Sequence, residues 1–134
     1  MVNITTQRNR DFLKECKKRA AILKMEGQNA TIDDIVDFVL LNPAPRYYAD
    51  QSRIYPKVIK ALAGMELDFS NDQAREGFDD LIRDLKAACA AYPCDSVRLN
   101  LMRLTAGMFG SPRFYIARQR AMKLARLIFD NYVA

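Results

Sequence analysis

The sequence predicts an all-α fold, with six helices in a single domain built from a tandem duplication of a three-helix unit. Three observations indicate this. Apolar residues recur at helical spacing almost throughout the 134 residues, and no strand-like alternation of useful length occurs. Pro, Gly and capping residues divide the pattern into segments of helix length. The phrase Pro-Arg-aromatic-Tyr occurs at residues 45–48 and again at 112–115, half a chain length apart.

Three helices are expected in the first half of the chain, residues 1–67. The first runs from about residue 6 to 26 and ends at Gly27, where a C-terminal cap glycine belongs. The second begins after the N-cap residue Thr31 and ends at the sequence NPAP. The third begins after Asp50, although Pro56 predicts a bend or a later start. Their apolar faces are Phe12, Cys16, Ala20 and Leu23; Ile32, Ile35, Val36, Val39 and Leu40; and Ile54, Val58, Ala61 and Leu62.

Three more helices are expected in residues 68–134, in the same order. The fourth begins near Ser70, whose spacing from Gln73 fits a capping box. The fifth begins after Asp95 or Ser96 and ends at the sequence FGSP, and the sixth runs from about residue 117 to 133. Their apolar faces are Ala74, Phe78, Leu81, Ile82, Leu85 and Cys89; Val97, Leu101, Leu104 and Met108; and Ala121, Leu124, Ala125, Ile128 and Tyr132.

The repeated phrase, PRYY in one half and PRFY in the other, is interpreted as a structural corner. Pro ends the preceding helix and favours extended backbone before it. If the segment is extended, its two aromatic side chains point to opposite sides, so that one fills the gap between the flanking helices. The Arg side chain is placed to bond the last carbonyls of the preceding helix. Alternatively, Arg and Tyr exposed at a helix N-terminus suit phosphate contact and base stacking.

The composition argues against an enzyme. There is no His, which removes the commonest general base and metal ligand, and there is no Gly-rich phosphate loop. The carboxylates of Asp79 and Asp80 are sequence neighbours, which do not face each other on a helix. We therefore expect no catalytic residues, no cofactor and no metal.

The three cysteines indicate reduced thiols in a cytoplasmic setting. Their number is odd and they lack Cys-x-x-Cys spacing. Cys16 and Cys89 are expected to be small core residues, with a Cys89–Cys94 bridge as the alternative. The N-terminal segment lacks the apolar region of a secretory signal, and no apolar run approaches the ~20 residues of a membrane span. No membrane partner is expected.

Charge is distributed unevenly along the chain, which has a net charge of +5. Residues 96–129 contain seven basic side chains and no acidic one, whereas residues 66–84 contain seven acids and two bases. The first helix adds Lys14, Lys17, Lys18, Arg19 and Lys24. Basic and acidic helix faces either lie in solvent or pair with each other inside the molecule. A basic surface is also the electrostatic footprint of nucleic-acid binding.

We interpret the chain as a non-enzymatic nucleic-acid-binding protein that uses basic amphipathic helices, with DNA preferred over RNA as the partner. The alternative is a protein-interaction or structural protein, such as a phage virion component or an adaptor or inhibitor of a host complex, and self-association stays open. The link between the second and third helices, NPAPRYYA, is longer than the 3–4-residue turn of a helix-turn-helix motif, which argues against that motif. The predicted nucleic-acid-binding residues are Arg46, Tyr48, Arg53, Lys57, Lys60, Arg113, Tyr115, Arg118, Arg120, Lys123 and Arg126.

The repeated phrase also resembles one in small uncharacterised helical proteins of gut Bacteroidota and their phages or mobile elements. There it reads roughly Pro-Ala-Pro-Arg-Phe-Tyr, followed by a small cap residue and a helix. The second copy here departs from this pattern, because Ala117 replaces the cap residue. The resemblance implies a small intracellular binding protein linked to phages, and no particular activity. The matching residues are Pro43, Ala44, Pro45, Arg46, Tyr47 and Tyr48 in the first copy and Ser111, Pro112, Arg113, Phe114 and Tyr115 in the second.

Overall fold

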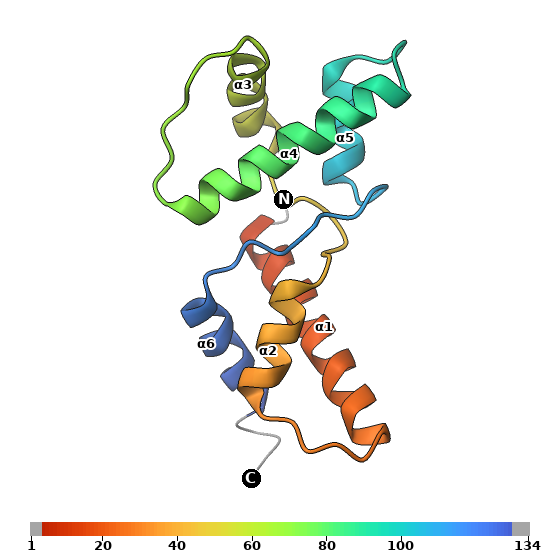
Figure 1. Cartoon of the computed structure of the whole chain (residues 1–134), viewed down its shortest axis with the longest axis vertical. Helices are drawn as coiled ribbons and strands as arrows, with labels where there is room; N and C mark the ends of the chain where they lie inside the picture. Colours follow the sequence, from red (N-terminus) through yellow and green to blue (C-terminus); the bar gives the residue numbers. More distant parts are fainter. Residues whose placement is uncertain (1–3, 130–134) are drawn as a thin grey trace. The chain divides into compact units, whose positions relative to one another are not determined.

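The chain is all-helical, as the sequence predicts. The computed structural model describes residues 4–129, with the side chain of Ile4 excepted. These residues form α1 (Ile4–Met25), α2 (Ile32–Leu41), α3 (Gln51–Leu62), α4 (Asp72–Ala91), α5 (Val97–Thr105) and α6 (Arg118–Phe129) (Figure 1). The described part contains no strand, only an isolated antiparallel bridge between Ala44 and Ser111. The predicted end of the sixth helix, with Tyr132, lies outside the described residues.

Local capping sets most of the helix boundaries. Thr31 forms a capping box with Asp34, Asp50 accepts from the backbone N–H of Ser52, and Ser96 accepts from that of Leu99. Gly27 has φ 71°, the left-handed conformation expected of a C-terminal glycine. The capping box predicted at Ser70 is wrong. Asn71, one residue later, caps α4, because its Oδ1 accepts from the N–H of Ala74 at 2.7 Å.

Contacts between helices divide the chain into two compact units. Unit 1 contains α1, α2 and α6, and unit 2 contains α3, α4 and α5 (Figure 1). The chain passes from one unit to the other after Pro43 and again after Pro112. Each unit therefore combines two helices from one half of the chain with the third helix of the other half.

The core of unit 1 is built around two phenylalanines. Phe12 of α1 and Phe114, in the segment before α6, are fully buried or nearly so, and their rings meet edge to face with centroids 5.6 Å apart. Ile116, which follows Phe114 by two residues, is also buried. α6 contributes the small buried residues Ala121 and Ala125. The other buried apolar side chains of the unit are Cys16, Leu23, Ile35, Val36, Val39, Met122 and Phe129.

The core of unit 2 is completed by Tyr47, which precedes α3. Its ring is 4% exposed, its backbone N–H donates to the carbonyl of Leu104 at 3.2 Å, and its hydroxyl donates to the carboxylate of Asp84. Tyr47 thus contacts both α4 and α5. The buried apolar side chains on the helices of this unit are Val58, Phe78, Leu81, Leu85, Ala88, Leu101 and Leu104.

The two copies of the repeated phrase form corners, and the first aromatic of each is buried. Tyr47 is 4% exposed and Phe114 is 2% exposed, which agrees with the predicted filling of a gap between helices. The second aromatics, Tyr48 and Tyr115, are half-buried. The extended backbone expected for this segment is wrong at Tyr115, whose φ of 57° lies in the left-handed region that non-glycine residues rarely adopt.

Arg46 does not cap the helix that precedes it. Its guanidinium instead lies beside Gly107, immediately beyond the C-terminal end of α5, where a Cβ on that glycine would lie 3.6 Å from Arg46 Nε. This Nε is buried and makes no hydrogen bond to the described residues. The position of α5 beside the corner, which the sequence does not reveal, accounts for the difference.

Candidate functional site

The predicted binding residues are divided between the two units. Unit 2 holds Arg46, Tyr48, Arg53, Lys57 and Lys60, and unit 1 holds the other six. On α3 the side chains of Arg53, Lys57 and Lys60 are all exposed. Their spacing of i, i+4 and i+7 places them on one side of that helix. Unit 2 therefore carries a short cationic stripe on α3.

Arg118, at the start of α6, is engaged inside unit 1. Its Nε donates to Asp37 Oδ1 at 2.8 Å and its Nη2 to Asp37 Oδ2 at 3.3 Å, and Asp33 Oδ1 lies 3.7 Å away. Hydrogen bonding to Arg118 lowers the pKa of Asp37, and the same bond raises the pKa of Arg118. The forked contact joins α6 to α2. Arg118 is thus oriented by two carboxylates, and its charge is largely balanced there.

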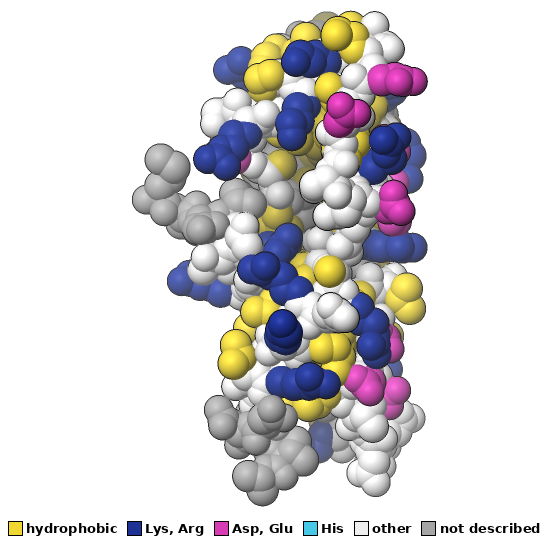
Figure 2. All heavy atoms as spheres, turned by 90° about the vertical axis from the view of Figure 1, so that its left-hand side faces the viewer, with side chains coloured by type: hydrophobic (Ala, Val, Ile, Leu, Met, Phe, Trp, Pro, Cys, Tyr) yellow, Lys and Arg dark blue, Asp and Glu magenta, His cyan; other side chains and the backbone are white. Residues whose placement is uncertain are grey.

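The remaining basic residues of α6 face solvent. Arg120, Lys123 and Arg126 are exposed, while Ala121, Ala125 and Phe129 of the same helix are buried. Arg113, ahead of the helix, is exposed as well. Figure 2 shows Lys and Arg side chains gathered over the α6 side of unit 1, with hydrophobic side chains between them. Leu127, 70% exposed, is one apolar residue on this solvent-facing side of α6. We call Arg120, Lys123 and Arg126 the α6 cations.

A longer cationic stripe lies on α1, and it was missing from the predicted site. Arg10, Lys14, Lys17 and Lys24 are exposed. Their spacing of i, i+4, i+7 and i+14 keeps them within an arc of about 80° at 100° per residue. The acids Asp11 and Glu15 project from another side of the helix and are half-buried. The helical spacing of these four cations was the sequence signal that could have found this α1 stripe.

Tyr48 and Tyr115, predicted to stack on bases, are only partly accessible. Both are half-buried, and Tyr115 is held in the left-handed conformation directly ahead of α6. A left-handed non-glycine residue costs of the order of 1–2 kcal/mol, which the surrounding unit must compensate. Both rings therefore serve the corners at least in part.

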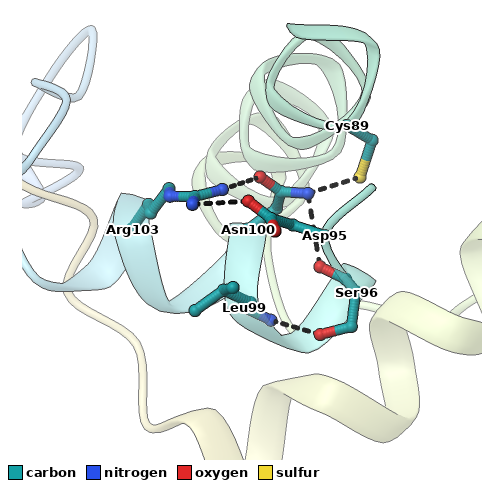
Figure 3. A network of polar contacts seen from close by, with 6 residues as sticks. All are labelled: Cys89, Asp95, Ser96, Leu99, Asn100 and Arg103. Atoms are coloured by element: carbon teal, nitrogen blue, oxygen red, sulfur yellow. Dashed lines mark hydrogen bonds and ion pairs between the residues drawn. The ribbon is translucent and has the colours of Figure 1, made fainter. Parts of the chain in front are cut away.

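Two other basic residues of the segment 96–129, which contains no acidic residue, make contacts within unit 2. Arg103 donates to Asn100 Oδ1 at 2.7 Å and to Asp95 Oδ2 at 2.6 Å (Figure 3). Its guanidinium also lies 4.1 Å from the ring centroid of Tyr92. Arg98 lies over the ring of Tyr55 at 4.1 Å. These contacts hold the α4–α5 loop and α3 against α5.

Asn100 is the centre of this polar network. Its side chain is fully buried, and its Nδ2 donates to the carbonyl of Ser96 at 3.2 Å and points to Cys89 Sγ at 3.6 Å (Figure 3). A buried amide is costly unless it is hydrogen-bonded, so these contacts stabilise the turn into α5. We interpret the network as structural, because none of the buried side-chain nitrogen or oxygen atoms in it lacks a hydrogen-bond partner.

The acidic segment of residues 66–84 also lies in unit 2. Within it, Arg83 pairs with Asp80 at 3.1 Å and with Asp84 at 3.2 Å. The two units thus differ in surface charge, and the exposed cations of α1 and α6 belong to unit 1. No helix in the described residues has the length and apolar character needed to span a membrane. Searches against family models, curated proteins and solved structures find no match to this chain.

Proposed function

We propose that this chain is a non-enzymatic nucleic-acid-binding protein and that unit 1 supplies its main binding surface. The observation that supports this most is the α1 stripe, in which four exposed cations follow one side of a 22-residue helix. The α6 cations add three more on the same unit. Lys and Arg on such a surface bind phosphates and release the counterions condensed on the nucleic acid.

The length of the α1 stripe suits a phosphate backbone. Arg10 and Lys24 lie about 21 Å apart along the helix axis, at 1.5 Å per residue. Successive phosphates on one strand of B-DNA are about 3.4 Å apart along its axis but wind around it, so this straight stripe of four cations can contact at most about four phosphates. Contacts of this kind carry affinity without base readout. The proposed mechanism is therefore charge neutralisation, with DNA as the favoured partner.

We propose that the α3 stripe, formed by Arg53, Lys57 and Lys60, makes a second and weaker contact with the nucleic acid. Arg46, which precedes α3 in the sequence, would add to it. Arg53, Lys57 and Lys60 are exposed on unit 2, but this unit also carries the acidic segment of residues 66–84. Phosphates are repelled by nearby carboxylates, so we expect α3 to contribute less than α1. The free state of Cys16, Cys89 and Cys94 fits a cytoplasmic location for such a protein.

Binding is tested by fluorescence anisotropy with labelled DNA at salt concentrations from about 50 to 200 mM. We expect a linear fall of log K with log salt. The double substitution Lys14→Gln/Lys17→Gln should reduce the magnitude of that slope by about 1.4 to 1.8, since each lost phosphate contact changes it by about 0.7 to 0.9.

The matched control is Lys86→Gln, which removes an exposed cation from α4 and should leave the slope unchanged. Absence of any binding at about 50 mM salt, where phosphate contacts are strongest, would refute the proposed function. The charged surface would then belong to the alternative class, a protein-interaction protein, and native size-exclusion chromatography with candidate acidic proteins would follow.

We also propose that the two halves arose by tandem duplication. The buried positions of α2 and α5 support this, because they stand four, five and eight residues after the N-caps Thr31 and Ser96. The third helices agree too, since Val58 and Ala125 are buried at the eighth position of α3 and α6. The matched buried residues after the two N-caps are Ile35, Val36 and Val39 in α2 and Asn100, Leu101 and Leu104 in α5.

If the halves are copies, their third helices have exchanged places. Unit 1 then carries the third helix of the second half, and unit 2 that of the first. A protease site introduced at residues 65–66, in the exposed loop between α3 and α4, tests this exchange. We expect the two fragments to stay together in native size-exclusion chromatography. Separation of two folded fragments would show that each half holds its own three helices.

A further inference from the structure

A cleft between α1 and α2 in unit 1 has no role in the fold described so far. Its volume is about 310 Å³, and it is bordered by the segment that carries Phe114. Ile22 of α1 and Phe38 of α2, both on its wall, are 38% and 41% exposed. These two side chains give the cleft an accessible apolar surface. Its volume lies at the lower limit of small-ligand pockets.

A flat cationic group lies at the wall of this cleft. The guanidinium carbon of Arg19 lies 3.7 Å from the ring centroid of Phe38, which is a close cation–π contact. Among residues 4–129, no carboxylate forms an ion pair with Arg19. The guanidinium covers one face of the Phe38 ring, and the stacked pair offers the outer face of the guanidinium to a flat partner. Such surfaces stack unpaired nucleobases.

Several polar groups around the cleft suit a nucleotide. Lys18 and Arg19 line it and offer positive charge to an adjoining phosphate, whereas Glu15, on a different side of α1 from the α1 stripe, adds a carboxylate to the lining. Asn42 donates its Nδ2 to the carbonyl of Phe38, which leaves its Oδ1 as an acceptor at the wall. An amide acceptor suits the exocyclic amino group of a base.

We propose that this cleft holds one unstacked base of a single-stranded nucleic acid, and that the chain therefore prefers single strands to duplex. Bases in a duplex are stacked and paired and offer no free face, whereas bases in a single strand do. The guanidinium of Arg19, supported by the Phe38 ring beneath it, would stack on the base, Ile22 would contact its edge, and Lys18 would bind the adjoining phosphate. This inference rests on the proposed function, because the backbone must first be held on unit 1.

The test compares a fluorescently labelled single strand with a duplex of the same sequence and length, by anisotropy at about 50 mM salt. We expect tighter binding of the single strand. Phe38→Ala should weaken single-strand binding by roughly 5- to 150-fold, which is the cost of losing one base stack, and leave duplex binding unchanged. A second single strand carrying 2-aminopurine should change its fluorescence on binding, and Phe38→Ala should abolish that change.

Leu41→Ala is the matched control, because Leu41 is a 70% exposed apolar residue of α2 that does not line the cleft. It should bind both probes as the original chain does. Circular dichroism checks that each variant is folded. Equal loss of both probes in Phe38→Ala, or an unchanged affinity for the single strand, would overturn the base-binding cleft while the proposed function stands. Absence of binding to either probe would overturn both.

Discussion

Arg118 Nε donates to Asp37 Oδ1 at 2.8 Å across 81 residues of sequence, and this contact joins the first turn of α6 to α2. Arg118 comes from the second half of the chain and Asp37 from the first. The pair therefore marks the arrangement that distinguishes the fold, in which the last helix belongs with the first two.

The Arg118–Asp37 pair should make unit 1 sensitive to acid. Hydrogen bonding holds the folded-state pKa of Asp37 below its ordinary value, so its contribution to stability is present above the unfolded pKa and is lost as pH falls through the folded one. Asp37→Asn should therefore lower Tm at pH 7, and the difference from the original chain should shrink progressively as the pH is lowered below the ordinary carboxyl range. Thermal unfolding followed by circular dichroism over a series of acidic pH values measures this.

The contribution of this exposed pair is expected to be small and to weaken in high salt. A double-mutant cycle with Arg118→Gln isolates it, and Asp79→Asn, an exposed carboxylate on α4, is the control. Coupling between Asp37 and Arg118 that stays constant from pH 7 down through the acid transition would contradict the interpretation.

The edge-to-face contact between Phe12 and Phe114 should be a main source of stability for unit 1. Phe114 is 2% exposed, and truncation to Ala should cost about 3–5 kcal/mol, because it leaves a cavity as well as removing buried surface. Phe114→Leu should cost less, since Leu fills part of that volume. Urea unfolding measures both, with Leu127→Ala, at a 70% exposed position, as the control. A Phe114→Ala variant as stable as that control would refute the assignment.

The amide of Asn100 should hold the start of α5. Replacing it by Ala removes its bonds to Ser96 and Arg103 and should cost about 1–3 kcal/mol, with the slope of the urea transition unchanged. Met102→Ala, at a 45% exposed position on the same helix, should have a much smaller effect. If both substitutions cost the same, the network of Figure 3 does not stabilise this turn.

The three cysteines should differ in reactivity. Burial, with the nearby Glu15 adding to it, raises the pKa of Cys16 to about 12, so its thiolate is scarce at neutral pH. Cys94 is exposed and Cys89 is half-buried. A thiol-reactive dye should therefore modify Cys94 first in the folded protein and Cys16 only on unfolding. Cys94→Ser should abolish the fast phase of labelling, and a fast phase removed by Cys16→Ser would be contrary to the structure.

The helices themselves could be predicted from the sequence, because their signals are local. Apolar residues repeat every three or four positions in α4, and a side chain such as Thr31 or Ser96 caps the turn that follows it directly. The start of α4 shows the limit of such signals. Ser70 and Asn71 are both good N-caps and adjacent in sequence, and only the backbone geometry decides between them.

The candidate site could be predicted only in part. Basic residues on α3 and α6 were recognised, and most of them are exposed. The sequence does not show that Arg118 is paired inside the unit while Arg120 is exposed, because the carboxylate that binds Arg118 lies 81 residues away. The α1 stripe can be predicted from the sequence, because its four cations recur at helical spacing. The cleft cannot be predicted in this way, because its wall combines Arg19 of α1 with Phe38 of α2, and only helix packing brings them together.

The sequence by itself determined that the chain forms six helices, where most of them begin, and that a corner with a buried aromatic recurs in each half. The helices and corners depend on contacts within a few residues, whereas the burial of Tyr47 and Phe114 in those corners comes from residues distant in sequence. Only the tertiary structure decided that α6 packs with α1 and α2 and that α3 packs with α4 and α5. The physical reason is that hydrophobic burial is non-directional. An apolar helix face encodes that it must be covered, while the choice of the covering helix depends on how side chains distant in sequence fit together.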